Sequence, residues 1–220
     1  KNNFTCFLSP DVIIPDGCFN NIEKVIESFD SFTILAPTYI DEITYKNYQI
    51  KNEKLLNNIN LDDFKLLEVD EIDFAMSIVN KSKIINDKLM DENFFLYFES
   101  TDACINLRNN KKKIYVVENL KFHHHGTESS DPKYSVDINI SRNWHFCWSK
   151  FYLLKKHYGY LHGIRKTIPN LVRSFKMCFT SLVKIDKENF RIHKASLSGL
   201  INSYFLKKSA YRPLENKEKN

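Results

Sequence analysis

The chain has 220 residues, of which 43% are hydrophobic and 14% aromatic, and its net charge is +5. A chain of this composition can bury one substantial core, which excludes a disordered protein and favours one domain, or one domain with an appendage. The five cysteines are scattered and never spaced as C-x-x-C, so neither a disulfide framework nor a zinc knuckle is expected, and a reducing cytosol fits best. No apolar run approaches the roughly 18–20 residues that span a bilayer, and the first residues lack the apolar core of a signal peptide.

The charge is divided unevenly along the chain. Residues 141–220 contain 17 basic and 4 acidic residues, a net charge of +13, whereas residues 1–140 have a net charge of −8. This asymmetry indicates an anionic surface or ligand for the basic end of the chain.

Short apolar runs alternate with helical patterns over residues 1–140. In chain order we expect a strand at 4–8, a helix at 20–29, a strand at 32–37, an apolar stretch at 64–79, a helix through 101–110 and a strand at 113–122. This alternation predicts an α/β fold, with a sheet covered by helices.

From Arg142 onwards the pattern becomes helical and basic. One apolar stripe of helical spacing contains Ile168, Leu171, Val172, Phe175, Phe179, Leu182 and Val183, with Pro169 expected near a helix start. An earlier stripe contains Trp144, Trp148, Phe151 and Tyr158. Either both stripes pack on the α/β body, which is the favoured interpretation, or at least one lies in a lipid interface beside its Lys and Arg residues.

Acidic residues that could carry chemistry occur in two places. Asp11 follows the first predicted strand, where a carboxylate could hold a divalent cation or simply cap a turn. Glu99 and Asp102 are three residues apart and would share one face of a helix, as a general base and its partner or as ordinary acids of a first helical turn.

Three consecutive histidines, His123, His124 and His125, follow the strand predicted at 113–122. Imidazole at a strand end is a good metal ligand, but adjacent strand residues alternate faces, so not all three can face one cleft. A surface histidine run is the alternative interpretation.

In this order the clusters resemble motifs of the family 2 glycosyltransferases of the GT-A fold, particularly the bacterial rhamnosyltransferase-like branch. The matching segments are LSPD at 8–11, LMDENFFLYFESTDA at 89–103, HHGTES at 124–129, RNWHFCWSKFYLLKKHYG at 142–159 and the closing SAYRP. The resemblance implies a partial GT-A, Rossmann-like mixed sheet at 1–140, followed at 141–220 by a helical, basic, amphipathic tail.

The resemblance also implies roles for individual residues. Asp11 and His124 would bind Mg²⁺ or Mn²⁺, with His123 and His125 as alternatives to His124. A carboxylate near Glu99, with Asp102 as a substitute, would be the catalytic base. Arg142 and His145 would contact the donor diphosphate.

Two departures from the family pattern affect these expectations. The E-D pair that usually supplies the base is Glu99-Ser100 here, and a serine hydroxyl cannot act as a base at neutral pH. The chain starts with Lys1 and shows no match to the family's first nucleotide-binding βαβ region, so we expect a fragment that lacks that part.

The sequence therefore predicts an inverting, metal-dependent glycosyltransferase of surface polysaccharide or lipid-linked glycan synthesis. Its partners would be a nucleotide-sugar donor, a glycan or lipid-linked acceptor and an anionic membrane surface, at the cytoplasmic face of the plasma membrane. A catalytically degenerate binding module is the alternative that Ser100 favours. Nucleic-acid binding ranks lowest, because the basic residues lie on helices with strong apolar faces and form no recognition motif.

Overall fold

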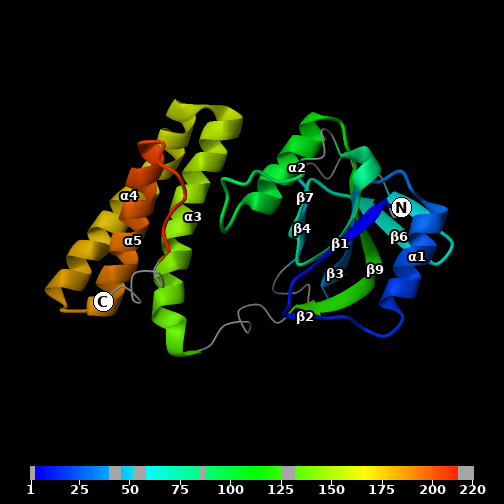
Figure 1. Ribbon diagram of the computed structural model, residues 1–220, viewed down its shortest axis with the longest axis horizontal. Coiled ribbons are helices and arrows are strands. Elements are labelled where there is room, and N and C mark those ends of the chain that lie inside the picture. The colour runs from blue at the N-terminus through cyan, green and yellow to red at the C-terminus, as the bar shows by residue number, and fades with distance from the viewer. Residues whose placement is uncertain (1–2, 40–45, 52–57, 85–87, 125–131, 213–220) are drawn as a thin grey trace. The chain divides into compact units, whose positions relative to one another are not determined.

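The computed structural model describes residues 3–39, 46–51, 58–84, 88–124 and 132–212, which fall into two compact units (Figure 1). The first unit comprises residues 1–90 and 100–129 and is an α/β domain. The second comprises residues 91–99 and 130–220 and is helical. The sequence placed the boundary between the α/β part and the helical part at residues 140 and 141. In the structure the long helices begin at Ser135, and the short segment 91–99 belongs to the helical unit.

A mixed sheet of seven strands forms the α/β unit. Its order is β1 (Phe4–Leu8), β8 (Met76–Asn80), β3 (Ile34–Tyr39), β9 (Ile114–His124), β6 (Phe64–Glu68) and β5 (Asn58–Leu61), with β2 (Val12–Ile13) paired to the end of β9. A separate pair joins β4 (Tyr48–Gln49) to β7 (Glu71–Ile72). The α/β class expected from the sequence is thus confirmed.

Strand direction brings several strand ends to one edge of the sheet. Strand β3 runs parallel to β9, and β8 runs antiparallel to both β1 and β3, so β1, β3 and β9 all point the same way. Their carboxyl ends, at Leu8, Tyr39 and His124, therefore lie at the same edge, where β8 begins. Loops at this edge of an open α/β sheet are the usual place for a ligand.

The sheet is covered on both faces, as alternation along its strands requires. Leu35 packs in the cluster that contains Ile22 and Val25 of helix α1 (Cys18–Ser28). Its neighbours Ile34 and Ala36 pack in a second cluster with Cys104 and Leu107 of helix α2 (Glu99–Asn109). Successive strand residues point to opposite faces, so one apolar strand fills two cores.

The predicted elements correspond closely to the observed ones, with one exception. The strands expected at 4–8, 32–37 and 113–122 and the helices expected at 20–29 and 101–110 are confirmed as β1, β3, β9, α1 and α2. The apolar stretch 64–79 proves to be three strands, β6, β7 and β8. Short apolar segments separated by acidic residues do not distinguish strands from a helix, so the sequence could not resolve this stretch.

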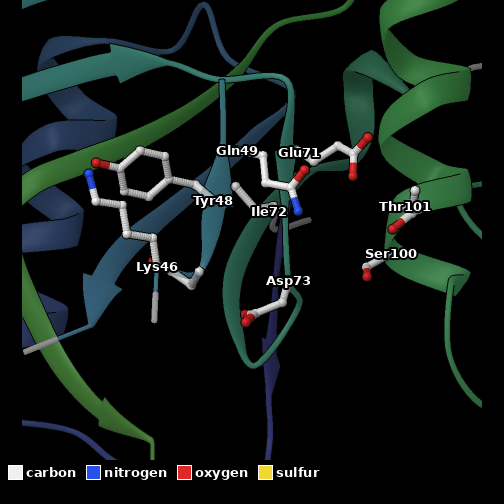
Figure 2. Close-up of a pocket in the computed structure, with 9 residues that line it drawn as sticks. Lys46, Tyr48, Gln49, Glu71, Ile72, Asp73, Ser100 and Thr101 are labelled. Atoms are coloured by element: carbon white, nitrogen blue, oxygen red, sulfur yellow. The ribbon is translucent and has the colours of Figure 1, made fainter. Parts of the chain in front are cut away.

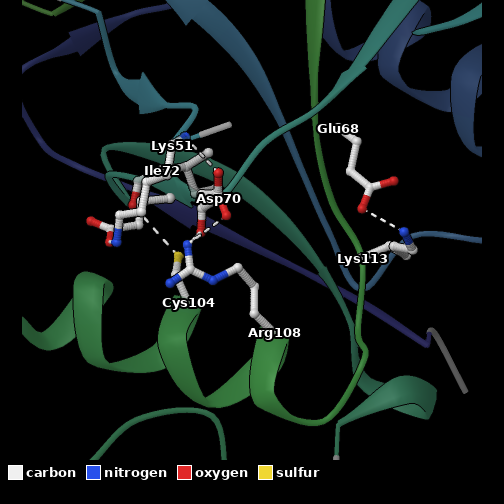
Figure 3. Close-up of polar contacts among 8 residues, drawn as sticks. Lys51, Glu68, Asp70, Ile72, Cys104, Arg108 and Lys113 are labelled. Atoms are coloured by element: carbon white, nitrogen blue, oxygen red, sulfur yellow. Dashed lines mark hydrogen bonds and ion pairs between the residues drawn. The ribbon is translucent and has the colours of Figure 1, made fainter. Parts of the chain in front are cut away.

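Polar contacts attach α2 to the loop beside β7 (Figure 3). Arg108 donates from one guanidinium nitrogen to the backbone and to the side-chain oxygen of Asp70, both at 2.9 Å. The other carboxylate oxygen of Asp70 accepts the backbone N–H of Lys51 at 2.7 Å. Burial raises the pKa of the Cys104 thiol to about 12, so this cysteine, which lies against Ile72, is an unreactive core residue. These contacts fix the second half of α2 against the segment that contains β7.

Three mutually packed helices make up the second unit: α3 (Ser135–Tyr158), α4 (Tyr160–Val183) and α5 (Lys187–Tyr204). Trp144 and Trp148 pack with Ala195 of α5, and Phe151 packs with Leu200. Trp144, Trp148 and Phe151 of this stripe therefore belong to the core of the helical unit itself. Tyr158, at the end of α3, is exposed.

Helix α4 differs from the sequence expectation at Pro169. The proline was expected near a helix start, but α4 begins at Tyr160, directly after Gly159 with a φ of 93°, and Pro169 lies inside the helix. A helix can continue through proline at the loss of one backbone hydrogen bond. None of the helices that the structure describes is long and apolar enough to cross a membrane.

Candidate functional site

Asp11 and His124 meet at the carboxyl edge of the sheet. Strand β2 pairs antiparallel with the end of β9, with Val12 opposite His124, so the residue before β2 comes next to the imidazole. The distance from Asp11 Oδ1 to His124 Nε2 is 3.2 Å, and the side chains are 9% and 23% exposed. The two residues that the sequence singled out as metal ligands are thus adjacent, although 113 positions separate them in the chain.

The alternation of strand residues selects one histidine from the run. His123 pairs with Ile13 and is exposed, whereas His124 points towards Asp11. His125, the remaining alternative ligand, lies outside the described residues, as does the rest of the segment HHGTES.

Hydrogen bonds continue from this pair to two further residues. The Tyr39 hydroxyl lies 2.9 Å from His124 Nδ1 and donates to Asp73 Oδ2 at 2.5 Å. Tyr39 ends β3, and Asp73 lies just before β8, so this network draws on several strand ends at one edge. At the other end, the hydroxyl of Ser9 donates to Asp11 Oδ1 at 2.5 Å. That hydrogen bond is the main reason why the pKa of Asp11 lies below its usual value, with a smaller contribution from His124.

The Tyr39 hydroxyl links Asp73 to His124. Since its one proton goes to Asp73, the contact with Nδ1 of His124 is a hydrogen bond when Nδ1 carries a proton. Nε2 of His124 then faces the ionised carboxylate of Asp11. Two lone pairs at this distance repel, and the arrangement is favourable only if Nε2 carries a proton or if both atoms bind a cation.

The Asp11–His124 pair fits a divalent cation whose remaining ligands come from elsewhere. Two ligands at adjacent corners of an octahedron with Mg²⁺ bond lengths lie about 3 Å apart, close to the 3.2 Å observed. Among the described residues no group of three His, Cys, Asp or Glu side chains could hold a metal. Mg²⁺ usually combines one or two protein carboxylates with water and substrate phosphates, so two protein ligands suit a cation shared with a diphosphate.

A polar pocket of about 110 Å³ opens between the β4–β7 pair and the start of α2 (Figure 2). Ser100 and Thr101 line it from α2, and Asp73 lines it from the opposite side. Asn47, which also lines it, has a buried side-chain oxygen without a hydrogen-bond partner among the described residues. The other lining side chains are mostly polar or charged, so the pocket suits a polar ligand.

Asp73 and Tyr39 are the site residues that the sequence reasoning missed. Asp73 lies both in the pocket that Ser100 lines and in the network that reaches His124. Asp73 is the last acid of the stretch VDEIDF and lies between β7 and β8. It is one of many acidic residues in the first part of the chain, and no sequence spacing relates it to Asp11 or His124. Only the pairing of the strands brings it to the site.

The expected catalytic acids Glu99 and Asp102 are placed differently from each other. Glu99 begins α2 and is half-buried, and one of its carboxylate oxygens has no hydrogen-bond partner among the described residues. Asp102 is fully buried and accepts a hydrogen bond from Asn106 at 3.2 Å. Asp102 is not among the residues that line the pocket, whereas Ser100 and Thr101 are.

Arg142, one of the two residues expected to contact the diphosphate, lies near Tyr97 in the helical unit. Burial raises the pKa of Tyr97, the positive charge of Arg142 lowers it, and the negative charge of Glu99 raises it further. Tyr97 and Phe98 both have left-handed backbones, with φ of 66° and 67°, immediately before α2. Such conformations cost about 1–2 kcal/mol each in non-glycine residues and are concentrated at functional sites.

His145, the other expected diphosphate ligand, is a core residue of the helical unit. It is fully buried, with Nε2 3.0 Å from the backbone oxygen of Tyr211 and Nδ1 3.0 Å from the hydroxyl of Ser209. Burial lowers its pKa, and the charge of Arg212 lowers it further, so the neutral form is favoured. With both ring nitrogens occupied, His145 holds the segment 209–212 on α3 and has no nitrogen free for a phosphate.

We expect that replacing Tyr39 by phenylalanine weakens Mn²⁺ binding about 10-fold or more. The substitution removes the hydroxyl that orients His124 through Nδ1, and loss of such a partner typically costs about 10–100-fold in metal affinity. Titration calorimetry on the wild type and the variant measures the change. Tyr48→Phe is the control, because Tyr48 lines the pocket but does not take part in this network; equal weakening in both variants would contradict the assigned role.

Comparisons with known proteins leave the family of this chain open. No family model matches it, and no curated protein matches it. Among solved structures, the crystal structure of A197 from STIV is similar, with 17% sequence identity and a TM-score of 0.37. The match covers 56% of this chain and 57% of A197. A likeness at this TM-score carries no argument about fold or function.

Proposed function

We propose that the protein is a divalent-metal-dependent glycosyltransferase that moves a sugar from a nucleotide-sugar donor to a glycan or lipid-linked acceptor, with inversion. The observation that carries the proposal is the contact between Asp11 and His124 at the carboxyl edge of the sheet, in an arrangement that a bound cation would stabilise. The GT-A form of the α/β fold belongs to the same proposal, and it is supported by the motif resemblance and by the mixed sheet.

In this proposal each side chain has a defined task. Asp11 and His124 hold the Mg²⁺ or Mn²⁺, while Ser9 and Tyr39 orient these two ligands. The cation, when bound, stabilises the negative charge of the departing diphosphate.

Asp73 is our candidate for the base, in place of the aspartate that the family pattern has at position 100. Asp73 lines the polar pocket, where an acceptor hydroxyl could donate its proton to the carboxylate. The hydroxyl oxygen then forms a bond to the anomeric carbon as the bond from that carbon to the donor phosphate breaks. The electron pair of the broken bond leaves with the diphosphate.

A binding module without catalysis is a second candidate, and Ser100 is the observation that favours it. The pocket residue at the position where the family pattern has its base is a hydroxyl. Such a module would bind the cation and a glycan but would not turn over a donor.

Hydrolysis of a panel of nucleotide-sugars in the presence of Mn²⁺ tests the proposal and separates the two candidates. We expect turnover with at least one donor, reduced about 100-fold or more in Asp73→Asn because the proton acceptor is removed. Asp16→Asn, an exposed acid of the same unit, is the control. A comparable loss in Glu99→Gln, with Asp73→Asn unaffected, would move the base to Glu99. Absence of turnover with every donor by the folded, Mn²⁺-binding protein would favour the binding module.

A further inference from the structure

Helix α4 is packed in the reverse of the usual way for a helix surrounded by water. The fully buried residues of the face that packs against its neighbours are small, with Ile164 and Leu171 partly buried beside them, whereas the exposed face contains large apolar residues. The buried residues are Gly163, Thr167, Ser174, Cys178 and Ser181. The exposed ones are Leu161, Ile168, Val172, Phe175, Phe179, Leu182 and Val183, which are 45–81% exposed.

The packed face shows close approach of helices through small side chains. A Cβ atom at Gly163 would lie 2.9 Å from the ring of Phe151, and Thr167 shares a hydrogen bond of 2.9 Å with the hydroxyl of Tyr204 on α5. Small residues and hydroxyl-mediated hydrogen bonds between helices, with bulky residues facing outwards, are typical of helices whose outer surface meets lipid.

The exposed face is a continuous apolar stripe along the helix. At 3.6 residues per turn, the seven residues fall within a sector of about 100°, and from Leu161 to Val183 the stripe is about 33 Å long. A stripe of this extent is larger than the scattered apolar residues that a monomeric surface normally shows, and it indicates an interaction surface.

Charge determines what kind of surface would cover the stripe. Helix α4 contains no acidic residue, and its four basic residues, Arg165, Lys166, Arg173 and Lys176, lie along the same flank of the apolar stripe. Two copies packed stripe to stripe in an antiparallel pair would bring these cations to the same side, which costs free energy, and α4 has no acidic residue that could pair with them in either orientation. An anionic lipid surface instead accepts the apolar stripe among its acyl chains and pairs its headgroups with the cations.

We propose that α4 is an interfacial helix that lies flat in the surface of an anionic lipid bilayer, with the apolar stripe between Leu161 and Val183 as its inserted face. This inference is independent of the proposed transferase activity. It follows from the surface of the helical unit alone and assigns that unit the task of holding the protein at a membrane.

Sedimentation with lipid vesicles tests the apolar part of the proposal. The protein should bind vesicles of equimolar phosphatidylcholine and phosphatidylglycerol and bind phosphatidylcholine vesicles far more weakly. Phe175→Ser combined with Phe179→Ser should weaken binding about 10-fold or more, because the two rings, 68% and 64% exposed, supply much of the inserted area. Phe19→Ser is the matched control, since Phe19 is an exposed aromatic residue of α1 in the other unit.

A second pair of variants tests the contribution of the basic residues to vesicle binding. Arg173→Gln with Lys176→Gln should weaken binding to the anionic vesicles roughly 25-fold, since each basic residue near the surface contributes about fivefold. Lys24→Gln with Lys81→Gln, which removes two exposed lysines of the α/β unit, should leave binding nearly unchanged. Added salt should weaken the binding of the wild type.

Three results would overturn the proposal. One is equal binding by the wild type and the Phe175/Phe179 variant. Another is a dimer in analytical ultracentrifugation that this variant dissociates, which would assign the stripe to a second copy. The third is a folded protein that binds no vesicles, which would mean that another part of the chain covers the stripe. Nucleotide-sugar hydrolysis in solution should be unchanged in the Phe175/Phe179 variant, so failure of one proposal is distinguishable from failure of the other.

Discussion

Asp11→Asn and His124→Ala should each weaken Mn²⁺ binding by more than about 100-fold, because each removes one of the two protein ligands and leaves its partner uncompensated. Titration calorimetry on the protein without any donor measures this directly. A second readout is the pH dependence. A metal binds the imidazole nitrogen and the carboxylate only in their deprotonated forms, so binding should weaken as the pH falls.

The histidine run provides the matched control for this experiment. His123→Ala changes the neighbouring residue, which is exposed and lies on the opposite face of β9, and it should leave the affinity unchanged within about twofold. The site would have to be reassigned if His123→Ala removed binding and His124→Ala did not. Unchanged binding in Asp11→Asn and in His124→Ala would mean that the pair is an ordinary ion pair.

Gly199→Ala should destabilise the helical unit by about 2–3 kcal/mol, although alanine is normally the better helix former. A Cβ at position 199 would lie 2.3 Å from the backbone oxygen of Trp144 and 3.1 Å from its carbonyl carbon. Backbone atoms cannot move aside as a flexible side chain can, so α5 would have to shift away from α3 and loosen the Trp144 packing. We expect the thermal unfolding midpoint of this unit to fall by about 10 °C or more.

Tryptophan fluorescence follows this transition, because Trp144 and Trp148 are the only tryptophans and both are buried between α3 and α5. Lys194→Ala on the same helix is the control, since its side chain is exposed and its replacement should change the stability by less than about 0.5 kcal/mol. A stabilising effect of Gly199→Ala, as at an open helical position, would show that the two helices do not approach so closely.

The strand and helix boundaries of the α/β unit were largely predictable because they depend on local patterns. Apolar runs bounded by turn residues gave β1, β3 and β9, and helical spacing gave α1 and α2. The stretch 64–79 was not resolved, because three buried strands in succession have no period that separates them from a helix. Pro169 was placed near a helix start because a local rule favours it there, whereas packing along the whole of α4 keeps it inside the helix.

The candidate site was predictable only where residues stand at the ends of strands. Asp11 and His124 were selected in this way, because strand ends of an open sheet converge on one edge. Asp73 and Tyr39 could not be selected, since their place depends on β8 entering the sheet between β1 and β3 and on the position of the β4–β7 pair. His145 was selected for its chemistry, but its burial against the segment 209–212 depends on contacts more than 60 residues away.

By itself, the sequence determined the α/β class, most of the helices and strands and the basic character of the second part. Each of these follows from composition, from a repeating period or from alternation along a strand. The tertiary structure alone decided which of the two apolar stripes is buried. Both have helical spacing, but the large residues of α3 fill the space between helices, whereas α4 approaches its neighbours mainly through small residues and leaves most of its large ones outside. Periodicity shows that a helix has an apolar face, and only packing shows what that face contacts.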